Sequence, residues 1–556
     1  MEVKEKIINI LKKETNLEDI NLEVPPNPEF GDYAFPCFQL AKIQKKKPVE
    51  IANELAQKIK NISEIKKIEV KGPYLNFFID KSAFAEKIID GILKKKEKYG
   101  CSGEGKGKKA LIEHTSINPN ASPHVGRARN ALIGDCLAKL LKFQEYKTET
   151  HYLVNDIGKQ IAMCVIGSKG KKVSFSNLLK VYVDVNKRMS DKIEKQAFEL
   201  LNKLEKKDKK VVKQFRDIVE VCVEGQKKIF AELGIVYNYF DYESDYLWNK
   251  KTEEVLKKLE KTKKLFKDKE GRMVLNQEEF KLAMKAPYLV LTRADRTSLY
   301  SLRDLAYTID KVIKRHDKNI VVLGEDQKLY FQQIKAALST IGYGAPEAVH
   351  YSFVLLKEGK MSTRKGNVVL LEEFMEEAIR KAKQEILKRN KKINKKELEN
   401  LSKAIAFGAI KYSILKVSPD KNVFFDWEQA LSFEGDSGPY IQYSYARICS
   451  ILKKYGKKIG TKIDYAYLDE NIEKNIITQL GSFPEVVNQS LIHLKPHLIA
   501  NYLYELAKSF NEFYHQCNIL KEIENIRDAR LVLILCIKQV LENGLDLLGI
   551  DAPERM

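Results

Sequence analysis

The residues best suited to chemistry lie in two clusters, the first of which contains His124, Gly126 and Arg127. His124 and Arg127 are one helical turn apart, so both side chains can face the same anion. Gly126 lets a ligand approach the backbone closely, and the unpaired N–H groups of a helix start suit phosphate. The cluster predicts a nucleotide site, although a lone histidine at a helix start is more often a cap or a packed core residue.

The second cluster is a basic loop in which Lys360, Arg364 and Lys365 fall within six residues, between Gly359 and Gly366. Such a loop can close over a polyphosphate and neutralise the charge that develops as a phosphate group leaves. Basic loops flanked by glycine are common, so this cluster alone is more typical of a solvated turn. It supports a nucleotide site only together with the first cluster.

Apolar runs that stop at polar or turn-forming residues predict the strands that position these clusters, at 110–112, 152–160, 288–291, 319–323 and 368–371. The first strand leads through a turn into a helix with one apolar face over 128–141. Polar residues at the carboxyl ends of strands face the ligand crevice of an open α/β sheet. The pattern therefore predicts an α/β fold in which several strands share one crevice.

Tyr300 and Asp304 form a further candidate pair, four residues apart at the helix start that follows residues 288–291. This spacing places a phenol and a carboxylate side by side on a helix. Such a pair can hold a cation.

The length and local patterns of the chain predict several domains, because 556 residues exceed what one hydrophobic core usually holds. Residues 1–82 predict a small α/β domain and 83–108 a helix and linker. A main domain is expected over 109–425, with a lysine-rich helical insertion at about 169–285, and an all-helical bundle over 426–556. Residues 239–247 break the pattern of the insertion and are expected to return the chain toward the site.

The composition favours a polyanionic partner, since the formal charge is +21 and the isoelectric point is near 9.2. A lysine-rich proteome would produce a similar excess without any binding role. The eight cysteines include no C-x-x-C pair, which argues against a zinc knuckle or a disulfide framework and fits a reducing cytosol. No signal peptide or membrane-spanning run is expected, so the sequence predicts a cytoplasmic protein with no membrane partner.

Aromatic residues interleaved with a cation mark two candidate surfaces for nucleic acid. Tyr74 lies in the N-terminal region, and the segment 440–447 contains Tyr440, Tyr443 and Arg447. Aromatic rings and guanidinium groups stack on splayed bases. Core packing remains the alternative for each tyrosine.

Together the two clusters resemble the HIGH and KMSKS signatures of class I aminoacyl-tRNA synthetases, through H-V-G-R at His124 and K-M-S-T-R at Lys360. Within that class the chain most resembles the arginyl-tRNA synthetases. The likeness includes K-M-S-T-R-K-G, the stretch 433–443, the ending 552–556 and Gly31-Asp32-Tyr33, so it covers nearly the whole chain. The resemblance implies a Rossmann-type catalytic domain, an N-terminal domain for the tRNA elbow and a helical anticodon-binding bundle.

The resemblance also implies residue roles in an ATP-dependent attachment of arginine to tRNA through an arginyl-adenylate. The guanidinium of arginine never loses its charge, so its pocket needs a carboxylate. The arginine-binding residues implied are Glu113, Asn118, Tyr300, Asp304 and Gln327, with Asn118 and Gln327 assigned to the α-amino and carboxylate groups.

For ATP the implied residues are His124, Gly126, Lys360, Met361 and Ser362, and for catalysis His124, Arg127, Lys360, Arg364 and Lys365. Mg²⁺ is expected to accompany ATP, and the sequence contains no dedicated metal-ligand cluster. For tRNA the implied residues are Tyr74, Asn76, Tyr440, Gln442, Tyr443 and Arg447. A monomer is expected.

Two departures from the signatures bear on catalysis. Arg127 stands where the second histidine of HIGH is found, and Thr363 stands where KMSKS has its second lysine. Many members of the family compensate with a lysine just before HIGH, but this chain has Ala121 there. Arg127, Arg364 or Lys365 is expected to supply the missing charge. Two alternatives stay open: a class I synthetase for another amino acid, and a non-catalytic tRNA-binding relative.

Overall fold

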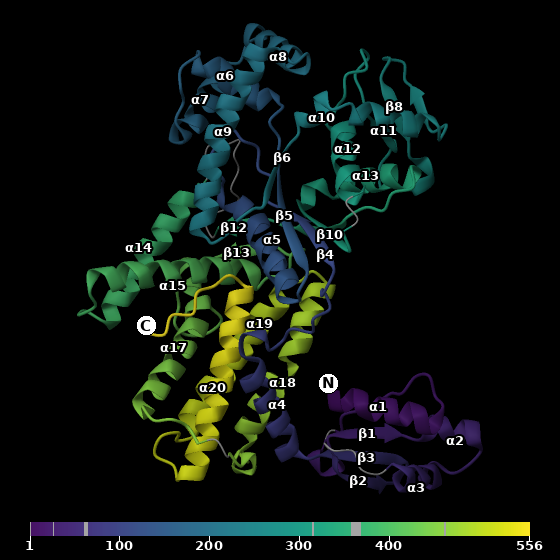
Figure 1. Ribbon diagram of the computed structural model, residues 1–556, viewed down its shortest axis with the longest axis vertical. Coiled ribbons are helices and arrows are strands. Elements are labelled where there is room, and N and C mark those ends of the chain that lie inside the picture. The colour runs from purple at the N-terminus through teal and green to yellow at the C-terminus, as the bar shows by residue number, and fades with distance from the viewer. Residues whose placement is uncertain (1, 26, 60–64, 314–315, 357–368, 461–462) are drawn as a thin grey trace.

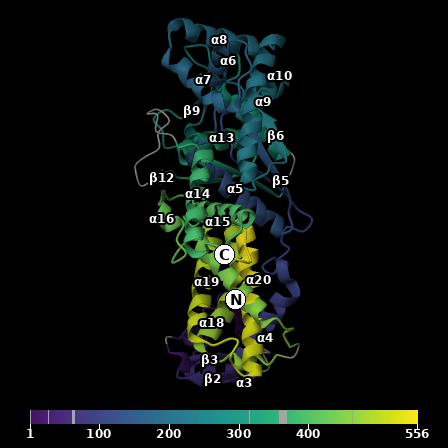
Figure 2. The same ribbon diagram turned by 90° about the vertical axis from the view of Figure 1, so that its left-hand side faces the viewer.

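The computed structural model describes residues 2–25, 27–59, 65–313, 316–356, 369–460 and 463–556. A parallel sheet lies in the middle of an elongated molecule, between two lobes at one end and a helical bundle at the other (Figure 1, Figure 2). A small N-terminal domain lies beside the lower end of the bundle (Figure 1).

The central sheet has five parallel strands in the order β11-β10-β4-β5-β6. They are β4 (Lys109–Glu113), β5 (Lys147–Val154), β6 (Tyr239–Tyr242), β10 (Lys318–Gly324) and β11 (Glu347–Tyr351). The strand order reverses between β4 and β10, because β5 and β6 extend one side of β4 while β10 and β11 extend the other. Ligands in open α/β sheets bind at such a reversal, outside the carboxyl ends of the strands. The predicted α/β class is confirmed.

The helix α5 (Val125–Phe143), which follows β4, is buried along almost its entire length. Its apolar residues pack against β4, β5 and β10 on one side and against α15 (Lys395–Leu415) on the other. α14 (Leu371–Arg389) lies beside α15 and also contacts α5. A helix enclosed on all sides must find partners for its polar side chains inside the protein.

Two excursions from the sheet form the upper lobes in Figure 1. The first, between β5 and β6, contains α6 (Lys159–Ser168), α7 (Phe175–Lys187), α8 (Asp191–Glu205) and α9 (Lys209–Glu232). The second, between β6 and β10, contains α10 (Asp245–Trp248), α11 (Lys251–Glu260), β7 (Leu265–Lys267), β8 (Met273–Asn276), β9 (Tyr288–Val290) and α12 (Tyr300–Ile313).

The predicted insertion at about 169–285 is therefore interrupted by β6, which belongs to the central sheet, as the break at 239–247 indicated. The prediction that residues 288–291 form a strand of the crevice sheet is wrong. β9 pairs antiparallel with β8 in a separate three-stranded sheet. A short apolar run carries no information about which strand it pairs with.

The remaining parts of the catalytic region are α13 (Lys328–Thr340), the parallel pair β12 (Val354–Leu356) and β13 (Val423–Phe425), and α16 (Trp427–Ala430). Of the strand predicted at 368–371, Val368 lies outside the described residues, Leu370 forms an isolated antiparallel bridge with His124, and α14 begins at Leu371. Glu372 and Glu373 lie in its first turn, where carboxylates interact favourably with the helix dipole.

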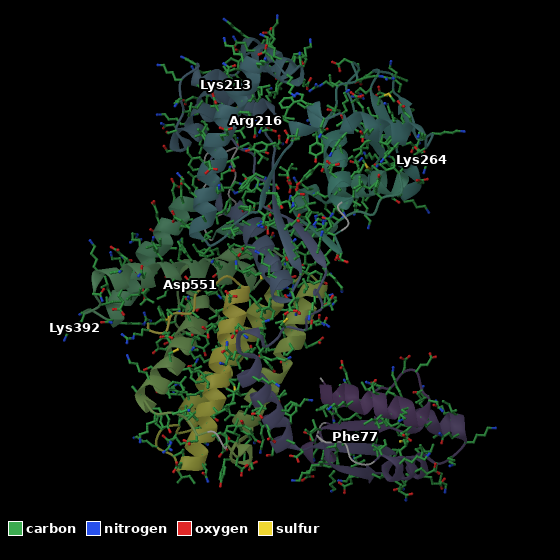
Figure 3. All side chains as sticks on the ribbon, in the orientation of Figure 1. Phe77, Lys213, Arg216, Lys264, Lys392 and Asp551 are labelled. Carbon is green, nitrogen blue, oxygen red and sulfur yellow. The ribbon has the colours of Figure 1, made fainter. Side chains whose placement is uncertain are left out.

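The N-terminal domain has its own apolar core around Ile7, Leu40 and Phe77 (Phe77 is labelled in Figure 3). It consists of α1 (Glu2–Thr15), β1 (Tyr33–Pro36), α2 (Phe38–Gln44), α3 (Pro48–Lys58), β2 (Ile65–Lys71) and β3 (Tyr74–Ile79), and its antiparallel sheet has the order β1-β3-β2. The small α/β domain predicted in this region is present.

The helical bundle contains α17 (Gly438–Tyr455), α18 (Asn471–Ile492), α19 (His497–Gln516) and α20 (Glu524–Leu547). The linker helix α4 (Lys81–Lys95) also belongs to it, since Ile89 and Ile92 are fully buried and the helix contacts α18 and α20. The Tyr99 hydroxyl donates to the carbonyl of Leu480, 3.0 Å away. Among the described helices, none is long and apolar enough to cross a membrane.

Arg129 joins α5 to the segments that contain β12 and β13. Its fully buried guanidinium donates to the carbonyls of Ser352 at 2.8 Å, Lys421 at 2.6 Å and Ser418 at 2.8 Å. Burial lowers the pKa of Arg129 to about 10, which leaves the group charged at neutral pH. One side chain therefore holds three separate backbone segments together.

Replacing the Arg129 guanidinium tests whether it holds these segments together. We expect Arg129→Met to lower the free energy of unfolding by about 3 kcal/mol, because the buried carbonyls lose their donor. Urea denaturation followed by tryptophan fluorescence measures the change. Arg380→Met, on an exposed part of α14, is the control, and equal denaturation midpoints for the two variants would contradict the assignment.

Candidate functional site

A cavity of about 210 Å³ opens where the strand order reverses. Its lining comes from the carboxyl ends of β4, β5 and β10, from the segment after β6, and from α5, α12 and α13. Six of the residues predicted for the site line it: Glu113, Asn118, Arg127, Tyr300, Asp304 and Gln327. The structure thus brings together side chains from segments far apart in the sequence.

The turn after β4 has an unusual backbone that shapes the wall of this cavity. Thr115 and Ser116 have φ values of 72° and 43°, a left-handed conformation that costs a β-branched residue free energy. The Thr115 amide donates to Asn130 Oδ1 at 2.5 Å, and its hydroxyl lies 2.7 Å from the hydroxyl of Tyr237. Asn130 Nδ2 donates to the carbonyl of Val322, 2.9 Å away. Asn130 therefore joins β4, α5 and β10 at the crevice.

Sequence reasoning missed these residues. Thr115 and Ser116 also line the cavity, but neither is a glycine or an asparagine that would indicate positive φ. The sequence offered one signal for Asn130, because a polar residue on the apolar face of a helix indicates a buried hydrogen-bonding role.

His124 is the N-cap residue of α5, and its ring lies against Gly126. A Cβ atom at position 126 would lie 3.1 Å from the ring atoms Nδ1 and Cε1, so any larger residue there would crowd the imidazole. Burial, and then the nearby Arg127, lower the pKa of His124 to about 4, which keeps the ring neutral at pH 7. Within the described residues its Nδ1 has no hydrogen-bond partner.

His124 and Gly126 do not line the cavity, in contrast to Arg127 one turn later. They lie at the N-terminus of α5, where backbone N–H groups without a helical partner favour anions. The cavity and this helix start form adjacent parts of one crevice.

The second cluster lies outside the described residues: nothing is described for Lys360, Met361, Ser362, Arg364 or Lys365. The segment that follows this cluster, from residue 369, is described by the structure. The Val125 amide donates to the carbonyl of Val369 at 3.2 Å, and the Leu371 amide donates to the carbonyl of Pro123 at 2.8 Å. The backbone after the basic loop is thus joined directly to the first cluster on both sides of His124.

Asp304 lies on α12 with its carboxylate at the cavity wall. It accepts hydrogen bonds from the Tyr330 hydroxyl at 2.9 Å and from the Thr308 hydroxyl at 3.4 Å. The rings of Tyr300 and Tyr330 lie beside each other with centroids 5.3 Å apart, and Tyr300 is 58% exposed. Burial raises the pKa of Asp304, and the charge of Lys311 opposes this shift.

Glu113, at the end of β4, forms a buried ion pair with Lys311 of α12. Asn118 and Gln327 are exposed at the cavity, and Asn118 Nδ2 donates to Gln160 Oε1 at 3.2 Å. Sequence reasoning did not single out Lys311.

The two upper lobes are joined above the crevice. Arg216 of α9, labelled in Figure 3, lies over the ring of Tyr242 at 4.2 Å and donates to the Ser244 hydroxyl at 3.0 Å. Arg293 donates to Glu205 at 2.6 Å, from the segment before α12 to the end of α8. These contacts fix the lobes relative to the cavity.

The residues predicted for nucleic acid divide into half-buried and buried ones. Tyr440, Tyr443 and Arg447 line a second cavity of about 530 Å³, and the Arg447 guanidinium lies 4.7 Å from the ring centre of Tyr443. Tyr74 is half-buried on β3, with its ring edge against Phe38.

Two residues predicted for nucleic-acid contact are buried in the structure. Asn76 is 3% exposed: it lies in the middle strand β3, between β1 and β2, on the face of the sheet opposite to the core residue Phe77. Gln442 is fully buried and donates to the carbonyls of Ala404 at 3.1 Å and of Asp551 at 2.8 Å (Asp551 is labelled in Figure 3). Its role is to join α17 to α15 and to the C-terminal segment.

No group of three or more His, Cys, Asp or Glu side chains suited to a metal ion occurs in the described part of the chain. The eight cysteines are free thiols.

Three family descriptions match the chain. Residues 88–427 match "tRNA synthetases class I (R), catalytic domain", residues 441–556 match "DALR anticodon binding domain", and residues 1–79 match "Arginyl tRNA synthetase N terminal domain".

Curated and solved relatives cover the whole length. The chain is 41% identical to the arginine–tRNA ligase of Methanocaldococcus jannaschii, covering 100% of both chains, and 38% identical to that of Clostridioides difficile, covering 100% of this chain and 98% of the relative. It is similar to the solved arginyl-tRNA synthetase of Thermus thermophilus, with a TM-score of 0.82 and 27% identity over 100% of this chain and 99% of that one.

The hydrogen bonds of Asn130 generate a prediction. We expect Asn130→Leu to lower the stability of the crevice turn by about 2–4 kcal/mol, since the Thr115 amide and the Val322 carbonyl both lose a buried partner. Faster hydrogen exchange at the Thr115 amide measures this loss. Asn390→Leu, at an exposed loop, is the control, and unchanged exchange at Thr115 in Asn130→Leu would refute the role of Asn130.

Proposed function

Because this chain belongs to the arginyl-tRNA synthetases of class I, we propose that the cavity beside β4 and β10 binds arginine and that the adjacent start of α5 binds ATP. The enzyme uses ATP to attach L-arginine to tRNA, through an arginyl-adenylate. The observation that carries the site proposal is the carboxylate of Asp304, which faces the cavity and forms no ion pair within the described residues.

In this proposal Asp304 binds the guanidinium of the substrate. A guanidinium is planar, permanently charged and rich in donors, so it pairs well with a carboxylate. The rings of Tyr300 and Tyr330 lie beside Asp304 and can stack on the flat face of the bound guanidinium. Asn118 and Gln327, exposed at the cavity, bind the α-amino and carboxylate groups.

Activation joins the two parts of the crevice. An oxygen of the arginine carboxylate attacks the α-phosphorus of ATP, the bond from that phosphorus to the bridging oxygen breaks, and pyrophosphate leaves. The ribose hydroxyl at the tRNA terminus then attacks the activated carbonyl, and AMP leaves.

His124 binds ATP as a neutral imidazole, in keeping with its lowered pKa, and Gly126 leaves room for that ring. Arg127 provides a permanent cation near the phosphates. Lys360, Arg364 and Lys365, with Met361 and Ser362, stabilise the leaving pyrophosphate. By analogy with the family, Mg²⁺ accompanies ATP as its counter-ion.

The tRNA contacts are assigned to the half-buried residues only. Tyr440, Tyr443 and Arg447 form a stacking surface at the second cavity, and Tyr74 lies on the N-terminal domain. The proposed division is 1–82 for the tRNA elbow, 83–108 as connection, 109–425 for catalysis and 426–556 for the anticodon. We assign the enzyme to the cytoplasm as a monomer.

Removing the charge of Asp304 tests the arginine site. Asp304→Asn is expected to lower kcat/KM for arginine by about 100-fold or more, because the guanidinium loses its charged partner. Aminoacylation of transcribed tRNA with labelled arginine measures the change. The KM for ATP is the internal control, and an unaltered arginine KM would remove Asp304 from the site.

A pH dependence follows from the same group. The guanidinium binds the ionised carboxylate, and burial raises the pKa of Asp304, so protonation begins at a higher pH than for an ordinary aspartate. The KM for arginine is expected to rise as the pH falls below neutrality, and Asp304→Asn is expected to lose this dependence. Steady-state kinetics across pH 5.5–8 tests both statements.

Truncation at the second cavity tests the tRNA surface. Tyr443→Ala and Arg447→Met are each expected to raise the KM for tRNA by about 10-fold, the size of one lost base-stacking contact. Tyr467→Ala, a partly exposed tyrosine elsewhere in the bundle, is the control. Equal KM values for tRNA in all three variants would exclude this surface.

A further inference from the structure

Three carboxylates face the cavity, and two of them have buried basic partners. Glu113 pairs with Lys311, and their side chains are 7% and 4% exposed. Glu243, just after β6, accepts from Arg303 Nε at 2.7 Å. An unpaired buried charge is strongly disfavoured, so each pair is held together more firmly than a surface ion pair.

Asp304 differs from the other two. Its oxygens accept hydrogen bonds from Tyr330 and Thr308, which carry no positive charge. In the part of the chain that the structure describes, Asp304 forms no ion pair. Arg127 also lines the cavity, but it forms no ion pair with Asp304 in that part of the chain. Asp304 is therefore the carboxylate of the cavity that is left for the substrate guanidinium.

Lys311 is the basic residue whose charge acts on Asp304 from the same helix. The two residues are seven positions apart on α12, which places them on the same helix face two turns apart. The charge of Lys311 acts on Asp304. What holds the ammonium elsewhere is Glu113, together with the ring of Tyr307, whose centre lies 4.2 Å from Nζ.

We propose that Glu113 acts as a positioning residue: it holds the ammonium of Lys311 away from Asp304, so that one carboxylate stays available for a ligand with a single positive charge. This inference rests on the proposed role of Asp304. It deepens that role, since it makes the charge selectivity of the pocket a property of three residues. Glu113 then acts through Lys311 and does not contact the substrate.

The proposal predicts that two substitutions together do less harm than one. Glu113→Gln frees the ammonium of Lys311, which pairs with Asp304 and competes with the guanidinium, so the KM for arginine is expected to rise about 100-fold. Adding Lys311→Met removes the competitor. The double variant is expected to recover an arginine KM within about 5-fold of the parent enzyme, because a buried ion pair can often be replaced by neutral groups at little cost.

Charge selectivity gives a second readout. Citrulline is the neutral isostere of arginine, and it is used as a competitive inhibitor of aminoacylation. In Glu113→Gln, where Lys311 neutralises Asp304, the affinity for citrulline is expected to rise relative to the affinity for arginine. The double variant is expected to restore the preference for arginine. The KM values for ATP and tRNA, together with the thermal denaturation midpoints, are measured in parallel to show that the variants are folded.

The outcomes separate this inference from the function on which it rests. If the double variant is as impaired as Glu113→Gln, Glu113 contacts arginine directly and the inference is wrong. An unchanged arginine KM in Glu113→Gln also refutes it. If instead Asp304→Asn retains normal arginine use, the arginine site itself is misplaced. Glu428→Gln, at an exposed carboxylate outside the cavity, is the matched control and is expected to stay within about 3-fold of the parent KM.

Discussion

The enclosure of α5 is the constraint on which the rest of the structure depends. A helix covered by a sheet on one side and by α15 on the other has no solvent to satisfy its polar side chains. Arg129 and Asn130 are adjacent in sequence, and each hydrogen-bonds to backbone groups of different neighbouring segments. Arg129 binds the carbonyls before β12 and β13, while Asn130 binds the turn after β4 and the end of β10. The helix start at His124 is thereby held against both halves of the crevice.

The sequence predicted the parts of this arrangement that follow from local chemistry. Polar residues after apolar strands did converge, because the carboxyl ends of parallel strands share one edge. Asn118, after β4, and Gln327, after β10, line one cavity for this reason, whereas Asp304 comes to it from α12. One failure concerns the partner of a strand rather than its existence. The strand at 288–291 exists, but its pairing with β8 depends on residues that no periodicity identifies.

Residues that act over long sequence separations were also beyond sequence reasoning. Glu113 and Lys311 are 198 positions apart, and nothing near either residue indicates that they pair. Asn76 and Gln442 have side-chain types suited to nucleic acid, but their burial is decided by which neighbouring strand or helix covers them. The left-handed backbone at Thr115 arises from tertiary hydrogen bonds, since threonine has no intrinsic preference for it.

The position of α4 has a consequence for the order in which a nascent chain can acquire its structure. The N-terminal domain has its own core and can close as soon as its residues are available. α4 follows it directly, but its partners α18 and α20 come much later, and Tyr99 is 381 residues away from its acceptor Leu480. Ile89 and Ile92, which are buried in the folded protein, therefore remain exposed to solvent while the entire catalytic region is synthesised. Such a delay exposes apolar surface to premature association, so α4 is a segment that a chaperone would protect during synthesis.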